Sequence, residues 1–281
     1  MMENPIERKL LDYEAKGQGG LIIEIPMLPP VPNTQLHMAG LLVKAGIDVI
    51  QIPIPIRFPW MYGTRILQIQ RKAAEQRIWF EQSFDVLDRL VHAYPEQEFM
   101  PVGFYGGLQR MGQDAYVSRL AELGIHSADV PDYPLVHDED PRGLYAALKG
   151  VGIDYVTCIS SELALSPEGT PGYEQLVKVV ERSYGFSFLL ATAGGKTGEV
   201  KDIDYDMLSR AQEAVMRVQE RVGRRCPLVA VCGISTPEQV ERLTGIGLHV
   251  MFGSALFTRM MNGQSDEEIY DFLVSMRQAA R

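Results

Sequence analysis

The feature that most constrains the fold of this chain is an alternation, repeated eight times, of a short apolar run and a longer helical segment. Short apolar runs bounded by glycine or proline are typical of strands buried on both faces, as in a parallel sheet. Strands that alternate with helices predict an α/β fold, and eight such units predict a closed (β/α)8 barrel. The predicted strands are residues 21–26, 47–52, 101–105, 125–130, 155–159, 186–191, 228–231 and 248–252.

An open, doubly wound sheet is the alternative, but the GxGxxG fingerprint that often follows the first strand of such a sheet is absent. The length of 281 residues is close to the ~250 typical of one (β/α)8 barrel. No linker or low-complexity segment divides the chain, so residues 1–281 are predicted to form a single domain. An amphipathic segment at residues 7–16 predicts an extra N-terminal helix that could close the bottom of the barrel.

Two turns near the C-terminal end predict a binding site for an anion. The seventh strand is followed by Gly233 and a Ser-Thr-Pro helix start, and the eighth by Gly253 and Ser254. A helix start leaves backbone N–H groups unpaired, and glycine lets a ligand approach the backbone closely. Glycine and serine also occur in such loops for turn formation alone. Because (β/α)8 barrels frequently bind phosphate after strands seven and eight, two such turns favour a phosphorylated small molecule as the ligand.

Composition excludes several classes of partner. The net charge of −9, with a pI near 5.1 and no basic run, argues against nucleic acid or an anionic membrane. No signal peptide or membrane span is predicted. The three cysteines lack metal-site spacing, which predicts reduced thiols in a cytoplasmic protein. No HxH or HExxH motif occurs, so neither a metal nor another cofactor is predicted.

Several segments together resemble the tryptophan synthase alpha chain family. Residues 45–55 resemble its second strand, residues 130–134 the loop after strand four, and residues 195–198 the loop after strand six. Residues 232–240 and 253–255 resemble its two phosphate loops. The likeness covers nearly the whole chain and implies a lyase that splits indole-3-glycerol phosphate into indole and glyceraldehyde 3-phosphate. It also implies that the phosphate is bound by Gly198, Gly233, Gly253 and Ser254.

The residues that carry catalysis in this family are not matched. The family has a glutamate at the end of strand two, where this chain has Gln51, and an amide cannot act as an acid or a base near pH 7. The family's aspartate before the glycine that closes the next loop corresponds to Tyr62. Residues 57–61 replace a segment that also meets the family's beta subunit. The sequence therefore does not decide whether the chain cleaves an indole substrate. A beta-type subunit and a second copy of this chain, in a homo-oligomer, are both possible partners.

Polar residues stand where the family lines its indole pocket with apolar side chains, namely Glu24, Tyr105 and Asp129. Glu24 interrupts an apolar strand, so it faces either the barrel mouth or the surrounding helices. The mouth is favoured, because a carboxylate buried against helices without a partner is costly, although a structural pairing with an arginine is the alternative. Desolvation there would raise the pKa of Glu24, as a general acid or base requires. Asp129 shares this prediction, with Asp132 as its competitor or as a loop cap.

The remaining candidates lie mainly in loops. Tyr62 could donate a proton or pack on Trp60, and Arg57 could bind a substrate carboxylate or be solvated. None of the predicted strands contains a lysine, which argues against a Schiff-base aldolase. The predicted catalytic residues are Glu24, Asp129, Tyr62 and Gln51, and the predicted substrate contacts are Tyr105, Arg57 and Phe188.

Two functions of different classes follow from these residues. The first is a divergent lyase of the tryptophan synthase alpha type in a specialised pathway, acting by retro-aldol or proton-transfer chemistry on a phosphorylated relative of indole-3-glycerol phosphate. The second is a non-catalytic homologue that binds a phosphorylated ligand and regulates a partner enzyme.

Overall fold

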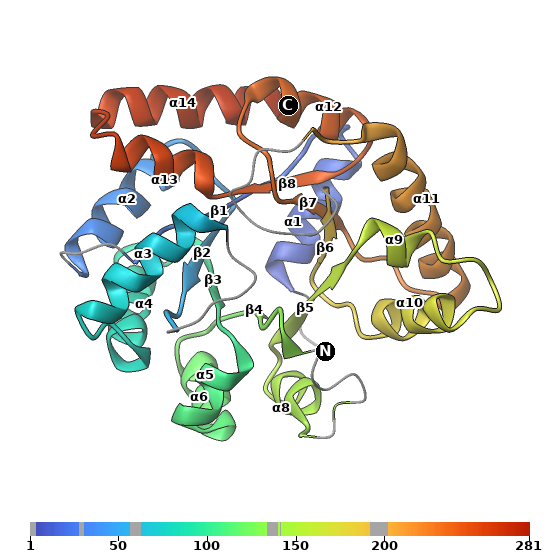
Figure 1. The fold of residues 1–281 in the computed structure, drawn as a ribbon, viewed down its shortest axis with the longest axis horizontal. Helices are drawn as coiled ribbons and strands as arrows, with labels where there is room; N and C mark the ends of the chain where they lie inside the picture. The colour runs from blue at the N-terminus through green and yellow to red at the C-terminus, as the bar shows by residue number, and fades with distance from the viewer. Residues whose placement is uncertain (1–3, 28–30, 57–62, 134–139, 141, 192–201) are drawn as a thin grey trace.

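The computed structural model describes the chain except for residues 1–3, 28–30, 57–62, 134–139, 141 and 192–201. Its strands form a closed parallel barrel in the order β1 to β8, with helices around the outside (Figure 1). The pairing of β1 with β8 closes the ring, so the predicted (β/α)8 barrel is confirmed. The strands are β1 (Leu21–Glu24), β2 (Val49–Pro53), β3 (Glu98–Val102), β4 (Ser127–Asp129), β5 (Asp154–Ile159), β6 (Ser187–Leu190), β7 (Leu228–Val231) and β8 (His249–Phe252).

Side chains alternate along the strands between two apolar cores. In β1, Ile22 belongs to the inner cluster of the barrel, whereas Ile23 belongs to the outer cluster between strands and helices. In β2, Val49 faces inward and Ile50 outward in the same way. Both faces of the strands are therefore buried, which explains why the sequence shows nearly continuous apolar runs.

The helices that cover the barrel lie mostly where the sequence predicts them. The expected break near residues 76–78 separates α3 from α4, and Thr236 caps α12 by accepting a hydrogen bond from the Gln239 N–H. A cap by Asn33 or Thr34 was wrong, because α2 already begins at Asn33. The helices are α2 (Asn33–Lys44), α3 (Thr64–Glu75), α4 (Phe80–Ala93), α5 (Tyr105–Met111), α6 (Gln113–Glu122), α8 (Leu144–Gly150), α9 (Ser161–Ala164), α10 (Pro171–Glu181), α11 (Tyr205–Val222), α12 (Pro237–Gly245), α13 (Ser254–Met261) and α14 (Asp266–Ala279).

The third strand lies three residues earlier than predicted. β3 pairs with β2 from Val49↔Glu98 to Pro53↔Val102, after which the chain leaves the sheet and begins α5 at Tyr105. The apolar run PVGFY is compatible with either a strand or a buried turn and helix start, and periodicity alone does not separate them. The prediction that Tyr105 ends a strand was therefore wrong.

An extra helix, α1 (Pro5–Glu14), lies across the N-terminal end of the strand ring (Figure 1). Its Ile6 and Leu10 are fully buried and join the inner cluster of the barrel. Asn4 caps α1 through its side-chain oxygen, while its Nδ2 donates to Ser127 Oγ at 3.0 Å and to Asp154 Oδ2 at 2.6 Å. The predicted N-terminal helix is thus fixed to β4 and β5, where it closes the barrel.

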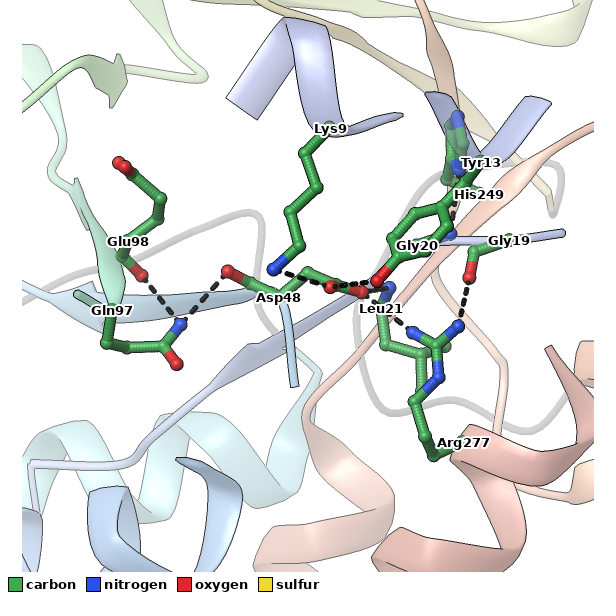
Figure 2. A network of polar contacts seen from close by, with 10 residues as sticks. All are labelled: Lys9, Tyr13, Gly19, Gly20, Leu21, Asp48, Gln97, Glu98, His249 and Arg277. Carbon is green, nitrogen blue, oxygen red and sulfur yellow. Dashed lines mark hydrogen bonds and ion pairs between the residues drawn. The ribbon is translucent and has the colours of Figure 1, made fainter. Parts of the chain in front are cut away.

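A polar network centred on Asp48 joins both ends of the chain to the barrel (Figure 2). The buried Asp48 carboxylate accepts hydrogen bonds from the Leu21 N–H at 2.8 Å, from Arg277 Nη1 at 2.8 Å and from the Tyr13 hydroxyl at 3.0 Å. Lys9 forms an ion pair with the same carboxylate at 2.9 Å. Residues of α1, β1 and α14 therefore meet on one aspartate beside β2.

Further contacts fill this end of the barrel. Arg277 Nη2 donates to the Gly19 carbonyl at 2.9 Å, and the Gly20 N–H donates to Nδ1 of the buried His249 at 2.8 Å (Figure 2). His249 begins β8, as the sequence predicts. Because α1 and this network occupy the N-terminal ends of the strands, a ligand site is to be sought at the opposite, C-terminal ends.

Candidate active site

Three polar side chains on β1, β2 and β4 face the barrel interior near the C-terminal ends of the strands. Glu24 ends β1 two residues after the inward-facing Ile22, and Gln51 stands two residues after the inward-facing Val49 of β2. Glu24 and Gln51 are partners in the strand pairing. Asp129 ends β4. The structure thus places Glu24 in the mouth rather than against the helices.

The three side chains form a buried polar group. Gln51 Nε2 donates a hydrogen bond to Asp129 Oδ2 at 3.1 Å. Glu24 is only 4% exposed and Asp129 only 5%. Among the residues that the structure describes, Glu24 Oε1 and Asp129 Oδ1 have no hydrogen-bond partner. Buried carboxyl oxygens without donors are unusual in a folded protein, and such groups are candidates for function.

Burial changes the acidity of both carboxyl groups. It raises the pKa of Glu24 to about 8, and the nearby Asp129 charge adds to the effect. Burial also raises the pKa of Asp129 to about 7, although the hydrogen bond from Gln51 opposes this rise. Because the charge of an ionised Asp129 raises the pKa of Glu24, ionisation of Asp129 favours the protonated form of Glu24. The mouth therefore contains an acid and a base that are both poised near neutral pH.

The two predicted phosphate turns lie at the ends of β7 and β8. Gly233 has a φ of 82°, and the preceding Cys232 has a φ of 78°, a left-handed conformation that residues other than glycine rarely adopt. Gly253 precedes α13, which begins at Ser254. Among the described residues, the N–H groups of Gly233 and Ser254 donate no hydrogen bond. Both turns therefore offer backbone donors of the kind that bind anions.

Glu24 lies directly beside the second of these turns. A Cβ atom added to Gly253 would stand 3.3 Å from the Cβ of Glu24. Glycine at this position thus allows β1 and the turn after β8 to approach each other closely. The carboxyl group and the candidate phosphate turn are consequently neighbours in one mouth.

The far side of the mouth is apolar. Phe188 of β6, predicted as a substrate contact, belongs to the inner cluster and packs edge-on against Phe186 at a centroid distance of 5.3 Å. The half-buried Cys158 and Val231 pack against the same cluster. Burial raises the pKa of Cys158 well above its ordinary value, so this thiol is neutral and a poor nucleophile.

Tyr105 has a different environment from the one predicted. Its ring packs on that of Tyr133, with centroids 4.7 Å apart, and its hydroxyl donates to Gln113 Oε1 at 3.4 Å. The reason is its position at the start of α5, where its N–H donates to Asp132 Oδ1 at 2.8 Å. Asp132 thus caps a helix, which is the alternative role considered for it. The predicted residues Tyr62, Arg57 and Gly198 lie outside the described residues.

A hollow of about 430 Å³ lies beside the mouth, and no pattern in the sequence predicts it. Its lining is largely apolar and comes from the ends of β2 and β3, the start of α4 and helix α5, with Pro55, Ile56, Trp79, Phe80, Phe104 and Met111 as its apolar members. The adjacent aromatic residues at the start of α4 were the only local signal. In the described part of the chain, no three His, Cys, Asp or Glu side chains gather into a metal site, and no helix is long and apolar enough to cross a bilayer.

Comparison with known proteins identifies relatives along nearly the whole chain. A family model described as "Tryptophan synthase alpha chain" matches residues 11–279. The tryptophan synthase alpha chain of Dehalococcoides mccartyi is 26% identical over 262 residues, covering 92% of this chain and 94% of the relative. That of Methanothermobacter thermautotrophicus is 25% identical over 248 residues, covering 85% of this chain and 82% of the relative.

Solved structures agree with this barrel. Mycobacterium tuberculosis tryptophan synthase superposes with a TM-score of 0.81 at 20% identity, covering 99% of both chains. Tryptophan synthase subunit alpha from Legionella pneumophila superposes with a TM-score of 0.80 at 19% identity, covering 99% of this chain and 98% of the other. At such identities the superpositions establish the fold.

Proposed function

The chain belongs to the tryptophan synthase alpha chain family, and from this membership we propose that it is a lyase acting on a phosphorylated small molecule related to indole-3-glycerol phosphate. Gly233, Gly253 and Ser254 would bind the phosphate through backbone N–H groups at the ends of β7 and β8. Glu24 and Asp129 would transfer protons. Binding the phosphate would hold the reacting carbon over the mouth of the barrel.

One observation carries the proposal: a carboxyl pair stands next to the phosphate turn. Glu24 and Asp129 are buried at the C-terminal ends of β1 and β4, and Glu24 adjoins Gly253. Two titratable groups whose environments give them different pKa values are the usual arrangement for an acid and a base. Gln51 supports the role of Asp129, because an amide donor on a carboxyl oxygen favours the ionised form.

The chemical step is a retro-aldol cleavage. The Asp129 carboxylate removes the proton of a substrate hydroxyl, the oxygen forms a carbonyl, and the neighbouring carbon–carbon bond breaks. The electron pair of that bond passes to the leaving fragment, which takes the proton of Glu24. One proton has then moved from Glu24 to Asp129 through the substrate, and exchange with water restores the starting state. The charge of the ionised Asp129 favours the protonated form of Glu24, so both groups can begin in the state that these roles require.

The test compares the wild type with Glu24→Gln in a coupled assay for glyceraldehyde 3-phosphate. Indole-3-glycerol phosphate and fructose 6-phosphate are suitable substrates, because cleavage of either one releases this aldehyde. We expect the wild type to release it and the variant to be at least about a hundredfold slower. Titration with inorganic phosphate is the matched measurement of binding, and the variant should retain the wild-type affinity. Equal turnover by the two proteins would exclude the role of Glu24.

The alternative is a non-catalytic homologue that binds the phosphorylated ligand and regulates a partner enzyme. The two buried carboxyl oxygens that lack donors among the described residues favour a catalytic role. Tight binding of both substrates without release of any product would favour the non-catalytic alternative. The family resemblance implies a beta-type subunit as the partner, and pairing of two copies of this chain is the other arrangement. Light scattering of the chain alone and mixed with a tryptophan synthase beta chain distinguishes these states.

A further inference from the structure

The mouth of the barrel contains carboxyl oxygens that receive no hydrogen bond from the residues that the structure describes. Glu24 Oε1 and Asp129 Oδ1 are buried and have no partner among the described residues. A buried acceptor without a donor is unfavourable, because it has lost its water without gaining a replacement. A bound molecule that brings N–H or O–H donors to these oxygens would recover that free energy. The floor of the mouth is therefore matched to a polar part of a ligand.

The position of Glu24 shows which part of the ligand it meets. β1 pairs with β8 up to Ile23↔Phe252, and the Cβ of Glu24 lies 3.3 Å from the Cβ position of Gly253. A ligand whose phosphate rests on the turn at Gly253 and Ser254 thus begins its carbon chain beside this carboxyl group. The first atoms after the phosphate, rather than a distant group, are within reach of Glu24.

Polar side chains gather on one side of the mouth. Glu24, Gln51 and Asp129 form a polar arc on β1, β2 and β4. Within this arc the hydrogen bond from Gln51 to Asp129 spans β3 and its inward-facing, apolar Met100. Cys158 and Val231 lie on β5 and β7, where they pack against the inner apolar cluster. A chain with hydroxyl groups along one edge and hydrogens along the other would match both arcs. An apolar ring over the polar arc would leave both carboxyl oxygens without donors.

We propose that the substrate is a short phosphate ester whose carbon chain carries several hydroxyl groups, and that these hydroxyls donate hydrogen bonds to Glu24 and Asp129. This rests on the proposed function, because the phosphate turns fix where the carbon chain begins. The site selects such a chain over an apolar one of the same length, since only the hydroxylated chain pairs the buried acceptors.

Calorimetric titration with two ligands of equal chain length tests the proposal. Erythritol 4-phosphate carries hydroxyl groups on three of its four carbon atoms, the fourth bearing the phosphate, and butyl phosphate carries none, so the hydroxyl groups are the difference between them. The wild type should bind erythritol 4-phosphate at least about tenfold more tightly than butyl phosphate. Glu24→Leu keeps the Cβ beside Gly253 but removes the acceptors, so its preference should fall to near unity or reverse. A thermal melt confirms that the variant is folded.

Each outcome separates this proposal from the proposed function. Binding of both esters with equal affinity, or tighter binding of butyl phosphate to the wild type, would overturn the substrate class while leaving the phosphate turns intact. An unchanged preference in Glu24→Leu would overturn the assignment to Glu24. Failure of the wild type to bind either ester or inorganic phosphate would overturn the phosphate site, and the substrate class with it. If Glu24→Leu binds butyl phosphate as tightly as the wild type binds erythritol 4-phosphate, the result would support both the phosphate site and the substrate class.

Discussion

Replacing Glu24 with glutamine should stabilise the protein by an amount that grows with pH. In the folded chain, burial raises the pKa of Glu24 from its ordinary value of 4.5 to about 8. The unfolded state therefore releases this proton at a lower pH than the folded state does. Below pH 4.5 the protonated group makes its full contribution to the free energy of unfolding. This contribution decreases as the pH rises above 4.5 and is lost once the pH has passed 8. Glutamine has nearly the same shape as protonated glutamic acid but does not titrate.

The size of the effect follows from the two pKa values. One pKa unit corresponds to about 1.4 kcal/mol, so the full loss above pH 8 is on the order of 5 kcal/mol. Between pH 5 and pH 8 the loss is about 3.5 kcal/mol, because the group is already largely ionised in the unfolded state at pH 5, and part of the loss has occurred by then. Glu24→Gln should thus match the wild type near pH 4 and exceed its free energy of unfolding by about 4 kcal/mol at pH 8.

Urea denaturation at a series of pH values measures this difference. Glu241→Gln on the surface of α12 is the matched control, because that side chain is exposed. Its free energy of unfolding should follow the wild-type curve throughout. Asp129 has a raised pKa as well, so the Glu24→Gln curve retains part of the wild-type slope.

A difference between Glu24→Gln and the wild type that stays constant from pH 5 to pH 8 would refute the reasoning. It would mean that Glu24 has an ordinary pKa in the folded protein, through water or donors that reach the carboxyl group. The acid role proposed for Glu24 in cleavage would then lose its physical basis.

The rate of turnover should depend on pH in a bell shape, rising near pH 7 and falling near pH 8. Asp129→Asn should abolish turnover. A stopped assay that gives the same rate across this pH range would contradict the acid–base pair. Arg277→Met removes the hydrogen bonds that Arg277 donates to the buried Asp48 carboxylate and to the Gly19 carbonyl (Figure 2), and should cost about 3 kcal/mol of stability in urea unfolding. The exposed Arg217→Met should cost less than about 0.5 kcal/mol. Gly253→Ala forces a Cβ against β1 and should weaken phosphate binding about tenfold by calorimetry, while Gly245→Ala, which meets only open space, should not change it.

Much of the fold could be predicted from the chain by local rules. The eight apolar runs and their helices specify a parallel barrel, because strands buried on both faces need helices as covers and eight of them close the ring. Thr236 and Pro237 mark the start of α12 because capping is a local interaction. The run at residues 101–105 was misread because strand pairing with β2, not composition, decides where β3 ends.

The candidate site divides in the same way. From the sequence alone, Glu24 stands out as a charge in an apolar strand, and Gly233 and Gly253 mark turns that need glycine. Only the closed ring brings β1 beside β8, and so sets Glu24 against Gly253 although the two residues are far apart in the chain. The hydrogen bond between Gln51 and Asp129 and the unpaired oxygens beside it likewise come from strands that meet only in the barrel. Sequence determines which side chains a strand carries, whereas burial and neighbouring charge, which decide their acidity, exist only after the strands have closed.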